Sequence, residues 1–283
     1  IFKWDGMSSE HIQFHMDSLV EFLMQGEGRM EISGVEGAAR ALLVERLAQK
    51  VRRPLVVLMP TLKMCRQFVD DFEFFRGGRR HPEVILFPPY NVLPFKRMSY
   101  HNETAAQRVR ALYLLAADSD PKVMVAPVET ILQRVMPKQS LNDFTELLMA
   151  GEETGRDGLI EKLTGGGYTQ TTLVEEPGEY SVRGGILDVY SSMYDNPLRI
   201  EFFGDRVESI RLFSPTTQRR IKDIDEAVIL PAREATFARQ QPAGIEDRTH
   251  KLAEESGISR NTAEAFLDQI GREGVFSGIE GFL

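Results

Sequence analysis

The chain has 283 residues, of which 42% are hydrophobic and 27% are charged, and its formal net charge at pH 7 is −8. This length is enough for about two or three domains of ordinary size. The acidic balance argues against a free-standing nucleic-acid-binding domain, because such domains usually carry a surplus of Lys and Arg. The single cysteine, Cys65, has no second thiol with which to form a disulfide or share a metal ion, and we expect no metal site.

Targeting signals are also missing from the sequence. It holds no signal peptide and no apolar run near the about 18 residues of a membrane-spanning helix, so we expect a cytoplasmic protein with no membrane partner. The chain begins at Ile1 without an initiator methionine and stops at Leu283 without a terminal signal. We therefore expect it to be a piece of a longer protein.

The first half of the chain alternates helical and strand patterns. Apolar residues at helical spacing predict helices at 8–23, 38–49, 61–75 and 103–117. Short apolar runs predict strands at 30–33, 55–59, 84–87 and 122–127. The run LVVLM at 55–59 lies between two prolines and is typical of a strand buried on both faces. This alternation predicts a parallel sheet with helices on its faces.

The pattern changes near residue 137. One helix is expected at 157–164, where three successive glycines end it, and strand-like runs with turn signals follow as far as Pro231. This part predicts a smaller α+β unit with antiparallel pairing. After Ala232 the sequence is polar and helical again, and Ser259 is placed to cap a helix at 261–270.

Residues 34–41 have the outline of a phosphate-binding loop. The segment GVEGAARA follows an expected strand and opens an expected helix, which is the context of the motif G-x-x-x-x-G-K-[ST]. Gly34 and Gly37 are present, but Ala39, Arg40 and Ala41 stand where the motif has Gly, Lys and Ser or Thr. Alanine offers Mg²⁺ no oxygen, and the bulky planar Arg does not replace Lys in a tight pocket. A chance strand–loop–helix with two glycines also explains the segment, and under both explanations we expect no nucleotide binding and no catalytic residues.

The run LRIEFF at 198–203 alternates as a half-buried strand does. The two-residue period places Leu198, Ile200 and Phe202 on the core face. Arg199, Glu201 and Phe203 then lie on the other face, and Phe203 is at the edge of a Gly204-Asp205 turn. An exposed aromatic ring beside an arginine is typical of a protein–protein interface, where both residue types are enriched.

The segment 180–190 is expected to be a neighbouring strand. Gly184 and Gly185 follow Arg183 and predict a β-bulge or a close approach of two backbones, which would re-aim the Arg183 side chain. Arginine is the only cation between residues 163 and 221, and its planar fork suits paired hydrogen bonds to carboxylates. Two interpretations stay open from this pattern. The arginines, which include Arg206, form a binding face for another protein, or they pair across strands with Glu179, Glu201, Asp205 and Glu208.

Several longer motifs together resemble one family. PGEYSVRGGILDVY at 177–190, PLRIEFFGDRVESIRLF at 197–213, TQRR at 217–220 and LPARE at 230–234 are similar to the N-terminal region of the bacterial transcription-repair coupling factors (Mfd). The segments GVEGAARALLV, FPPYNVLPFKRMSYHNETAAQRVRALYLL and VETILQRV also fit, so the resemblance covers essentially the whole chain. The same region of these proteins is similar to the DNA-repair protein UvrB.

This resemblance implies an α/β fold in three parts. Residues 1–141 would be the first part of a parallel-sheet domain that resembles a degenerate helicase or P-loop domain. Residues 142–231 would be a smaller inserted α+β domain, and residues 232–283 a truncated return segment of the first domain.

The resemblance also implies a function. The inserted domain would bind UvrA, and the positions that match the family's binding motif are Arg183, Arg199 and Phe203, with Gly184, Glu201 and Arg206 beside them. The chain would then be a non-catalytic recruitment module of transcription-coupled nucleotide excision repair. The longer protein would be an ATP-driven DNA translocase that displaces stalled RNA polymerase, and its C-terminal domain would mask the UvrA-binding face. ATP and Mg²⁺ are expected only at motor domains outside this chain.

A UvrB-like, nucleotide-dependent helicase domain that processes damaged DNA is the alternative. Two features argue against it. The loop at 34–41 lacks the Lys-Thr pair that UvrB carries, and the stretch 87–108 has only Tyr90 and Tyr100 where UvrB has a tyrosine-rich hairpin.

Overall fold

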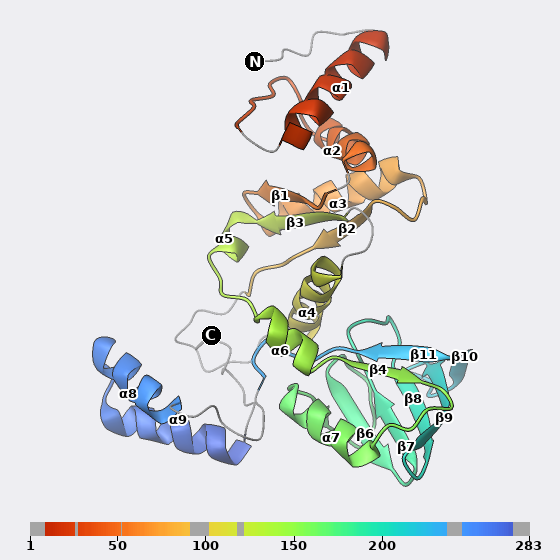
Figure 1. The fold of residues 1–283 in the computed structure, drawn as a ribbon, viewed down its shortest axis with the longest axis vertical. Helices are drawn as coiled ribbons and strands as arrows, with labels where there is room; N and C mark the ends of the chain where they lie inside the picture. The colour runs from red at the N-terminus through yellow and green to blue at the C-terminus, as the bar shows by residue number, and fades with distance from the viewer. Residues whose placement is uncertain are drawn as a thin grey trace. The chain divides into compact units, whose positions relative to one another are not determined.

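A computed structural model describes residues 9–25, 28–51, 53–90, 102–117, 122–236 and 245–273. These residues form two compact units (Figure 1). The first unit comprises Ile1–Pro89 and Leu114–Gln133, and the second comprises Tyr90–Tyr113 and Arg134–Leu283. Tyr100 and half of the stretch 87–108 that bears on the UvrB alternative, residues 91–101, lie outside the described residues. In the described part of the chain, no helix is both long and apolar enough to cross a lipid bilayer, and no group of His, Cys, Asp or Glu is arranged to hold a metal ion.

The first unit is built on a three-stranded parallel sheet in the order β1-β3-β2. Its strands are β1 (Leu55–Met59), β2 (Glu83–Leu86) and β3 (Lys122–Pro127). Its helices are α1 (Ser9–Gln25), α2 (Ala39–Lys50), α3 (Leu62–Arg76) and α5 (Val128–Ile131). Helix α4 (Asn102–Ala116) contributes residues to both units. The expected parallel sheet and the four expected long helices are confirmed.

Helix α3 supplies the core of the first unit. The Thr61 side chain accepts a hydrogen bond from the backbone N–H of Met64 at 3.3 Å and so caps the helix. The buried side chains of Cys65, Phe68 and Phe72 then share a hydrophobic cluster with Val123 and Val125 of β3. Cys65 is thus a packing residue, and burial raises the pKa of its thiol.

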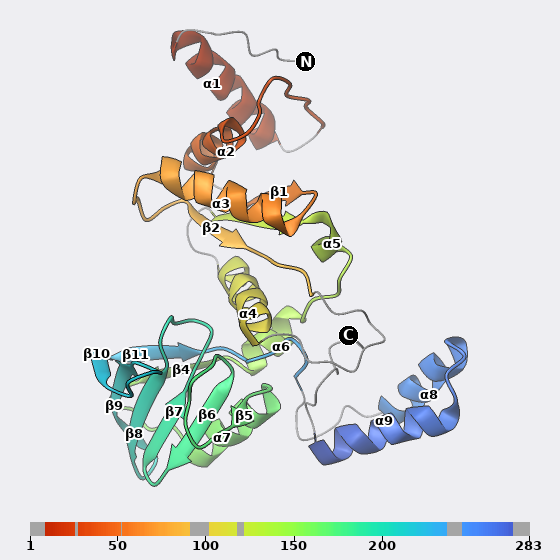
Figure 2. The same ribbon diagram turned by 180° about the vertical axis from the view of Figure 1, so that it is seen from behind.

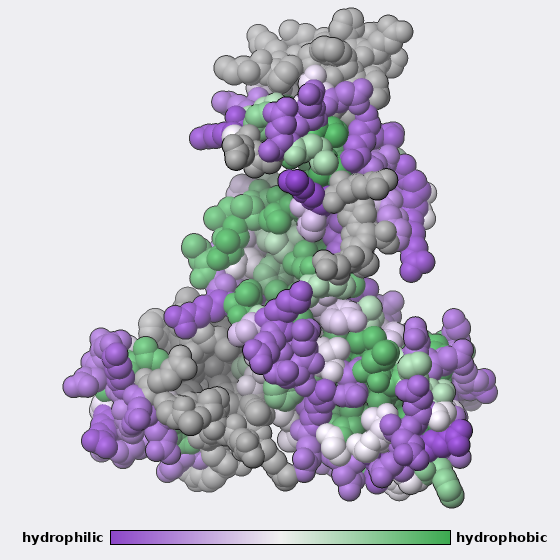
Figure 3. All heavy atoms as spheres, viewed as in Figure 1, coloured by the Kyte–Doolittle hydropathy of each residue, from purple (hydrophilic) through white to green (hydrophobic). Residues whose placement is uncertain are grey.

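Two expectations for the first unit are wrong. The run at 30–33 is not a strand, because only Ile32 makes a bridge. Strand β1 is not buried on both faces, since Val56 and Leu58 are exposed. The physical reason is that the alternate residues Leu55, Val57 and Met59 pack on the cluster with α3, whereas the opposite face of the strand has no cover among the described residues. Figure 3 shows hydrophobic side chains on the surface over β1, β3 and α5.

The second unit contains a six-stranded sheet in the order β10-β9-β8-β7-β6-β5, and a separate antiparallel pair, β11-β4. Only β5 pairs in parallel, so the expected antiparallel unit is confirmed for the other neighbours. The strands are β4 (Glu146–Met149), β5 (Thr169–Gln170), β6 (Glu179–Arg183), β7 (Ile186–Val189), β8 (Leu198–Phe203), β9 (Arg206–Phe213), β10 (Arg220–Ile224) and β11 (Glu226–Ile229). The helices are α6 (Lys138–Asp143), α7 (Arg156–Gly165), α8 (Ile245–Glu255) and α9 (Arg260–Glu273). Ser259 accepts a hydrogen bond from the backbone N–H of Thr262 at 3.2 Å, which confirms the expected cap.

One face of this sheet forms the core of the second unit. Helix α7 lies beside this sheet, as Figure 2 shows from behind, and its Leu159 and Leu163 pack with alternate residues of the strands. The strand residues in the cluster include Leu187, Val189, Leu198, Ile200, Phe202, Val207 and Ile210. This alternation leaves the opposite face of the sheet free for polar side chains.

A buried ion pair links three parts of the second unit that are far apart in sequence. Arg108 of α4 and Glu234, which follows β11, are both fully buried and hydrogen-bonded to each other. Glu234 also accepts hydrogen bonds from the Tyr90 hydroxyl at 2.8 Å and from the backbone N–H of Met136 at 3.0 Å. The Arg108 guanidinium lies 4.1 Å from the centre of the Tyr90 ring. The pair therefore fixes the chain where it enters and leaves the β-rich part of this unit.

Candidate functional site

Four neighbouring strands carry polar side chains in register on the face of the sheet that points away from the core. Asp188 of β7 lies opposite Ser181 of β6 and opposite Arg199 of β8, and Arg199 lies opposite Arg211 of β9. Directly opposed residues point to the same face of a sheet, so the register gathers them. We call this surface the polar face, and its members are Ser181, Arg183, Asp188, Arg199, Glu201, Phe203, Ser209 and Arg211.

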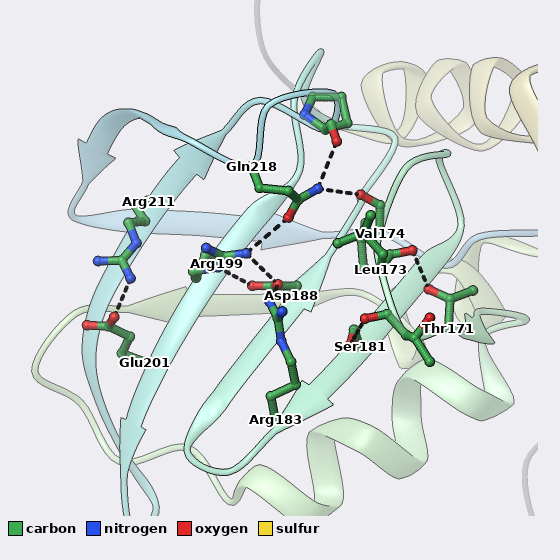
Figure 4. Close-up of polar contacts among 12 residues, drawn as sticks. Thr171, Leu173, Val174, Ser181, Arg183, Asp188, Arg199, Glu201, Arg211 and Gln218 are labelled. Carbon is green, nitrogen blue, oxygen red and sulfur yellow. Dashed lines mark hydrogen bonds and ion pairs between the residues drawn. The ribbon is translucent and has the colours of Figure 1, made fainter.

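Asp188 is the centre of the polar face. Its side chain is 1% exposed, and its two oxygens accept hydrogen bonds from Arg199 Nε at 2.6 Å and from Arg199 Nη2 at 2.8 Å (Figure 4). Arg183 Nη2 donates to the same carboxylate. A buried carboxylate is costly unless it is paired, and here two cations from two strands pair with it. Arg183 and Arg199 therefore belong to one site, which strand period alone did not establish.

Arg199 is held on several sides. Its side chain is 16% exposed, and its guanidinium carbon lies 4.4 Å from the centre of the Phe213 ring. Arg199 Nη2 also donates to the side-chain oxygen of Gln218 at 3.3 Å. Hydrogen bonding to Asp188 raises the pKa of Arg199 above its ordinary value. The arginine is thus a fixed charge in a defined orientation.

Phe203 is the exposed aromatic residue of this face. It is 76% exposed, whereas Phe202 beside it in the chain is buried, so the expected strand phase is confirmed. The hairpin tip that carries Phe203 is anchored to residues 151–156: the backbone N–H of Thr154 donates to Asp205 O at 2.7 Å, and that of Arg156 donates to Asp205 Oδ1 at 3.2 Å. Arg206 lies opposite Phe203 in the register and is also exposed. A large apolar ring is therefore presented to solvent on an anchored turn.

Glu201 is engaged within the sheet. It accepts hydrogen bonds from Ser209 Oγ at 2.9 Å and from Arg211 Nη2. The bond from Ser209 and the charge of Arg211 lower the pKa of Glu201. Cross-strand pairing of an arginine with Glu201 is thus confirmed. The set of expected acidic partners was nevertheless incomplete, because the carboxylate that binds both Arg183 and Arg199 is Asp188.

Gly184 and Gly185 form a turn. The segment 180–190 is two strands, β6 and β7, joined by this two-residue turn, so the expected single strand with a bulge at the glycines is wrong. Gly184 has a φ of 58°, in the left-handed region that suits glycine. A Cβ atom at Gly185 would lie 2.7 Å from the backbone oxygen of Phe202, so the expected close approach of two backbones is confirmed there. The register shift in this region lies instead between β8 and β9, where Glu201 pairs with Ser209 and Phe202 with Val207, so that Glu208 of β9 is the extra residue.

Replacing Gly185 by alanine should separate β7 from β8. We expect Gly185→Ala to lower the free energy of unfolding by about 1–3 kcal/mol, because the new methyl group meets a backbone atom that cannot rotate away. Urea unfolding followed by circular dichroism measures this change. Gly184→Asn is the matched control: asparagine tolerates the left-handed conformation, and a Cβ at Gly184 has no atom within 4 Å. Equal losses in the two variants would contradict the close-approach explanation.

The loop at 34–41 has a turn geometry of its own. Gly34 and Gly37 have φ angles of 80° and 54°. The backbone N–H groups of Ala39 and Arg40 donate to carbonyl groups three residues earlier, each at 3.2 Å, and Arg40 Nε donates to a carbonyl within the loop at 3.1 Å. Ala41 is fully buried in the hydrophobic cluster of the first unit. The residue that takes the place of the magnesium ligand is therefore a core residue.

Sequence reasoning gave no role to Asp188 and Gln218, whose side chains accept hydrogen bonds from Arg199. Asp188 alternates with Leu187 and Val189, whose burial places it on the outward face, and strand phase could have identified it. Gln218 lies in the motif TQRR, which contributed to the family resemblance but received no role. No local pattern indicates that a loop glutamine reaches Arg199.

Comparisons with known proteins place this geometry in a family context. Residues 147–234 match the family described as the UvrB interaction domain, and this segment contains the whole polar face. The chain is 32% identical over 269 residues to the transcription-repair-coupling factor of Myxococcus xanthus, covering 94% of the chain and 22% of that protein. It is 30% identical over 209 residues to the factor of Escherichia coli K12, covering 74% of the chain and 18% of that protein.

A further relative is the UvrABC system protein B of Thermosipho africanus, which is 26% identical over 226 residues, covering 76% of the chain and 34% of that protein. The resemblance found in the sequence motifs is thereby confirmed over most of the chain. Residues 147–234 belong to the UvrB interaction domain family, and the chain as a whole is related to the N-terminal region of the transcription-repair-coupling factors, of whose own length it spans about a fifth.

Proposed function

We propose that the chain is a non-catalytic recruitment module of transcription-coupled nucleotide excision repair, and that it binds UvrA through the polar face. The residues proposed to contact UvrA are Arg183, Arg199 and Phe203, with Gly184, Glu201 and Arg206 at the margin. The match to the UvrB interaction domain and the similarity to transcription-repair-coupling factors support this role.

One observation carries the proposal. Two arginines from different strands share the buried carboxylate of Asp188, and Phe203 is exposed on the same face of the same sheet. Arginine and aromatic residues are enriched at the centres of protein interfaces. Since the Asp188–Arg183–Arg199 group keeps one net positive charge, this face favours a partner with acidic groups.

The wider setting is part of the same proposal, because the chain spans about a fifth of the length of its relatives. Residues 142–231 would be the inserted domain, between residues 1–141 and a return segment at 232–283. In the longer protein we propose an ATP-driven translocase that acts on DNA and on stalled RNA polymerase, and a C-terminal domain that masks the polar face.

The similarity to UvrABC system protein B favours one alternative, a nucleotide-dependent helicase domain that processes damaged DNA. The loop at 34–41 argues against it. With Ala41 in the core and the Arg40 side chain engaged by the loop backbone, we propose that this chain binds neither ATP nor Mg²⁺.

Calorimetric titration of the purified chain with UvrA tests the proposed function. We expect saturable binding that weakens as salt rises, because charged side chains contribute to it. The same preparation should show no saturable binding of labelled ATP in equilibrium dialysis. Absence of binding to UvrA at low salt would overturn the recruitment role, and saturable ATP binding would favour the helicase alternative.

A further inference from the structure

Gln218 combines a strained backbone with a bridging side chain. Its φ is 59°, and it is the only non-glycine residue with a positive φ in the part of the chain that the structure describes. Glutamine is disfavoured in this conformation, and such residues persist where the surroundings hold them, commonly at functional sites. A residue that served only to make this turn would be glycine or asparagine.

Hydrogen bonds of the Gln218 side chain hold its backbone in this conformation. Its amide nitrogen donates to Pro215 O at 2.8 Å and to Val174 O at 3.4 Å, and its amide oxygen accepts from Arg199 Nη2 at 3.3 Å (Figure 4). Val174 itself is buried. One side chain therefore connects Arg199 to two loops that border the polar face.

The hydrogen bonds of Arg199 show which end of its guanidinium is left for a partner. A guanidinium has five N–H donors in a fixed plane. Asp188 accepts from Nε and Nη2, and Gln218 accepts from Nη2 as well. Nη1 donates to none of the described residues, so its two hydrogens stay available to an acceptor on a partner.

From this geometry we infer that Gln218 is a positioning residue, which fixes Arg199 so that its Nη1 end is presented to the binding partner. The inference rests on the proposed function for the identity of that partner, UvrA. Fixing a long side chain before association lowers the entropy that binding costs. Gln218 thus contributes to affinity through Arg199, without contacting UvrA.

Two substitutions separate this role from a role in the turn. Gln218→Gly removes the amide and relieves the backbone strain, so the unfolding midpoint in urea should change little. Gln218→Glu keeps an acceptor oxygen at the same reach from Arg199 and adds a negative charge opposite the guanidinium, but it loses the donors to Pro215 and Val174, whose carbonyl oxygens its second oxygen then faces. If Gln218 acts through Arg199, the glutamate variant should restore what the glycine variant loses.

The first readout needs no partner. The side-chain N–H signals of Arg199 in ¹⁵N NMR spectra can be assigned by their loss in Arg199→Lys. We expect these hydrogens to exchange with water about two- to tenfold faster in Gln218→Gly, and to slow again in Gln218→Glu. Unchanged exchange in Gln218→Gly would overturn the inference, even if the chain does not bind UvrA and the proposed function fails.

The second readout is affinity for UvrA. Gln218→Gly should weaken binding about three- to tenfold, and Gln218→Glu should stay within about twofold of the wild type. In an Arg199→Lys background, which keeps the charge opposite Asp188 but lacks the planar fork, Gln218→Gly should have no further effect. A full effect in that background would overturn the positioning role.

Discussion

Phe203→Ala is expected to weaken the binding of UvrA by about 2 kcal/mol or more, roughly thirtyfold in affinity, while the free energy of unfolding changes by less than about 0.5 kcal/mol. The aromatic ring is 76% exposed, so its removal opens no cavity in the core. Its apolar area contributes free energy only when a partner covers it, so it contributes to binding and not to folding. Calorimetric titration with UvrA and urea unfolding of the same preparation measure the two quantities.

The chain offers a matched control for this substitution. Phe74 of α3 is 78% exposed, so Phe74→Ala removes the same side chain at almost the same exposure, in the first unit instead of on the polar face. We expect Phe74→Ala to bind UvrA as the wild type does. Equal weakening by both variants would show a nonspecific effect, and no weakening by Phe203→Ala would remove Phe203 from the interface.

Substitution of Arg199 tests the proposed interface less directly than the sequence suggests. From the sequence, an exposed arginine could be replaced without loss of stability. In the structure it pairs with Asp188, whose side chain is 1% exposed, and removal of one partner of such a pair leaves a buried charge. A loss of binding in Arg199→Ala would therefore combine a lost contact with a disturbed site, whereas Arg199→Lys keeps the pair charged.

The sequence predicted those features that depend on local pattern. Apolar spacing located α2, β1, α3 and β3 to within a residue or two, because each has a long or clearly bounded apolar run. The two-residue period of β8 also separated buried from outward side chains correctly. For the same reason, the alternation in β8 is sufficient to identify Phe203 as an exposed residue.

Features that depend on strand register could not be predicted in the same way. The contact of Arg183 with Asp188 requires a turn at Gly184-Gly185, and a bulge there would have changed the pairing. The link from Gln218 to Arg199 joins residues 19 apart through a loop whose conformation no short motif specifies. The exposure of Val56 depends on whether another element covers that face of the sheet, and an apolar run does not show that.

The buried ion pair of Arg108 and Glu234 should be the polar contact that matters most for the stability of the second unit. Both side chains are 0% exposed, and Glu234 also accepts hydrogen bonds from Tyr90 and from the backbone of Met136. Burial is the main reason that the pKa of Tyr90 is raised, so its hydroxyl stays protonated and donates. Loss of the carboxylate would remove the acceptor that Arg108 Nε, the Tyr90 hydroxyl and the backbone N–H of Met136 share, in a place where both side chains of the pair are fully buried.

Glu234→Ala is therefore expected to lower the free energy of unfolding by about 3–5 kcal/mol. The double variant Arg108→Met with Glu234→Leu should recover most of this loss, because two apolar side chains of similar size need no counter-charge, and buried ion pairs can often be replaced in this way. Urea unfolding of the wild type, the single variant and the double variant, followed by circular dichroism, measures both effects. A loss below about 1 kcal/mol in Glu234→Ala would show that water or other acceptors compensate the guanidinium. An equal loss in the double variant would show instead that the hydrogen bonds to Tyr90 and Met136, and not the compensation of charge, are what Glu234 contributes.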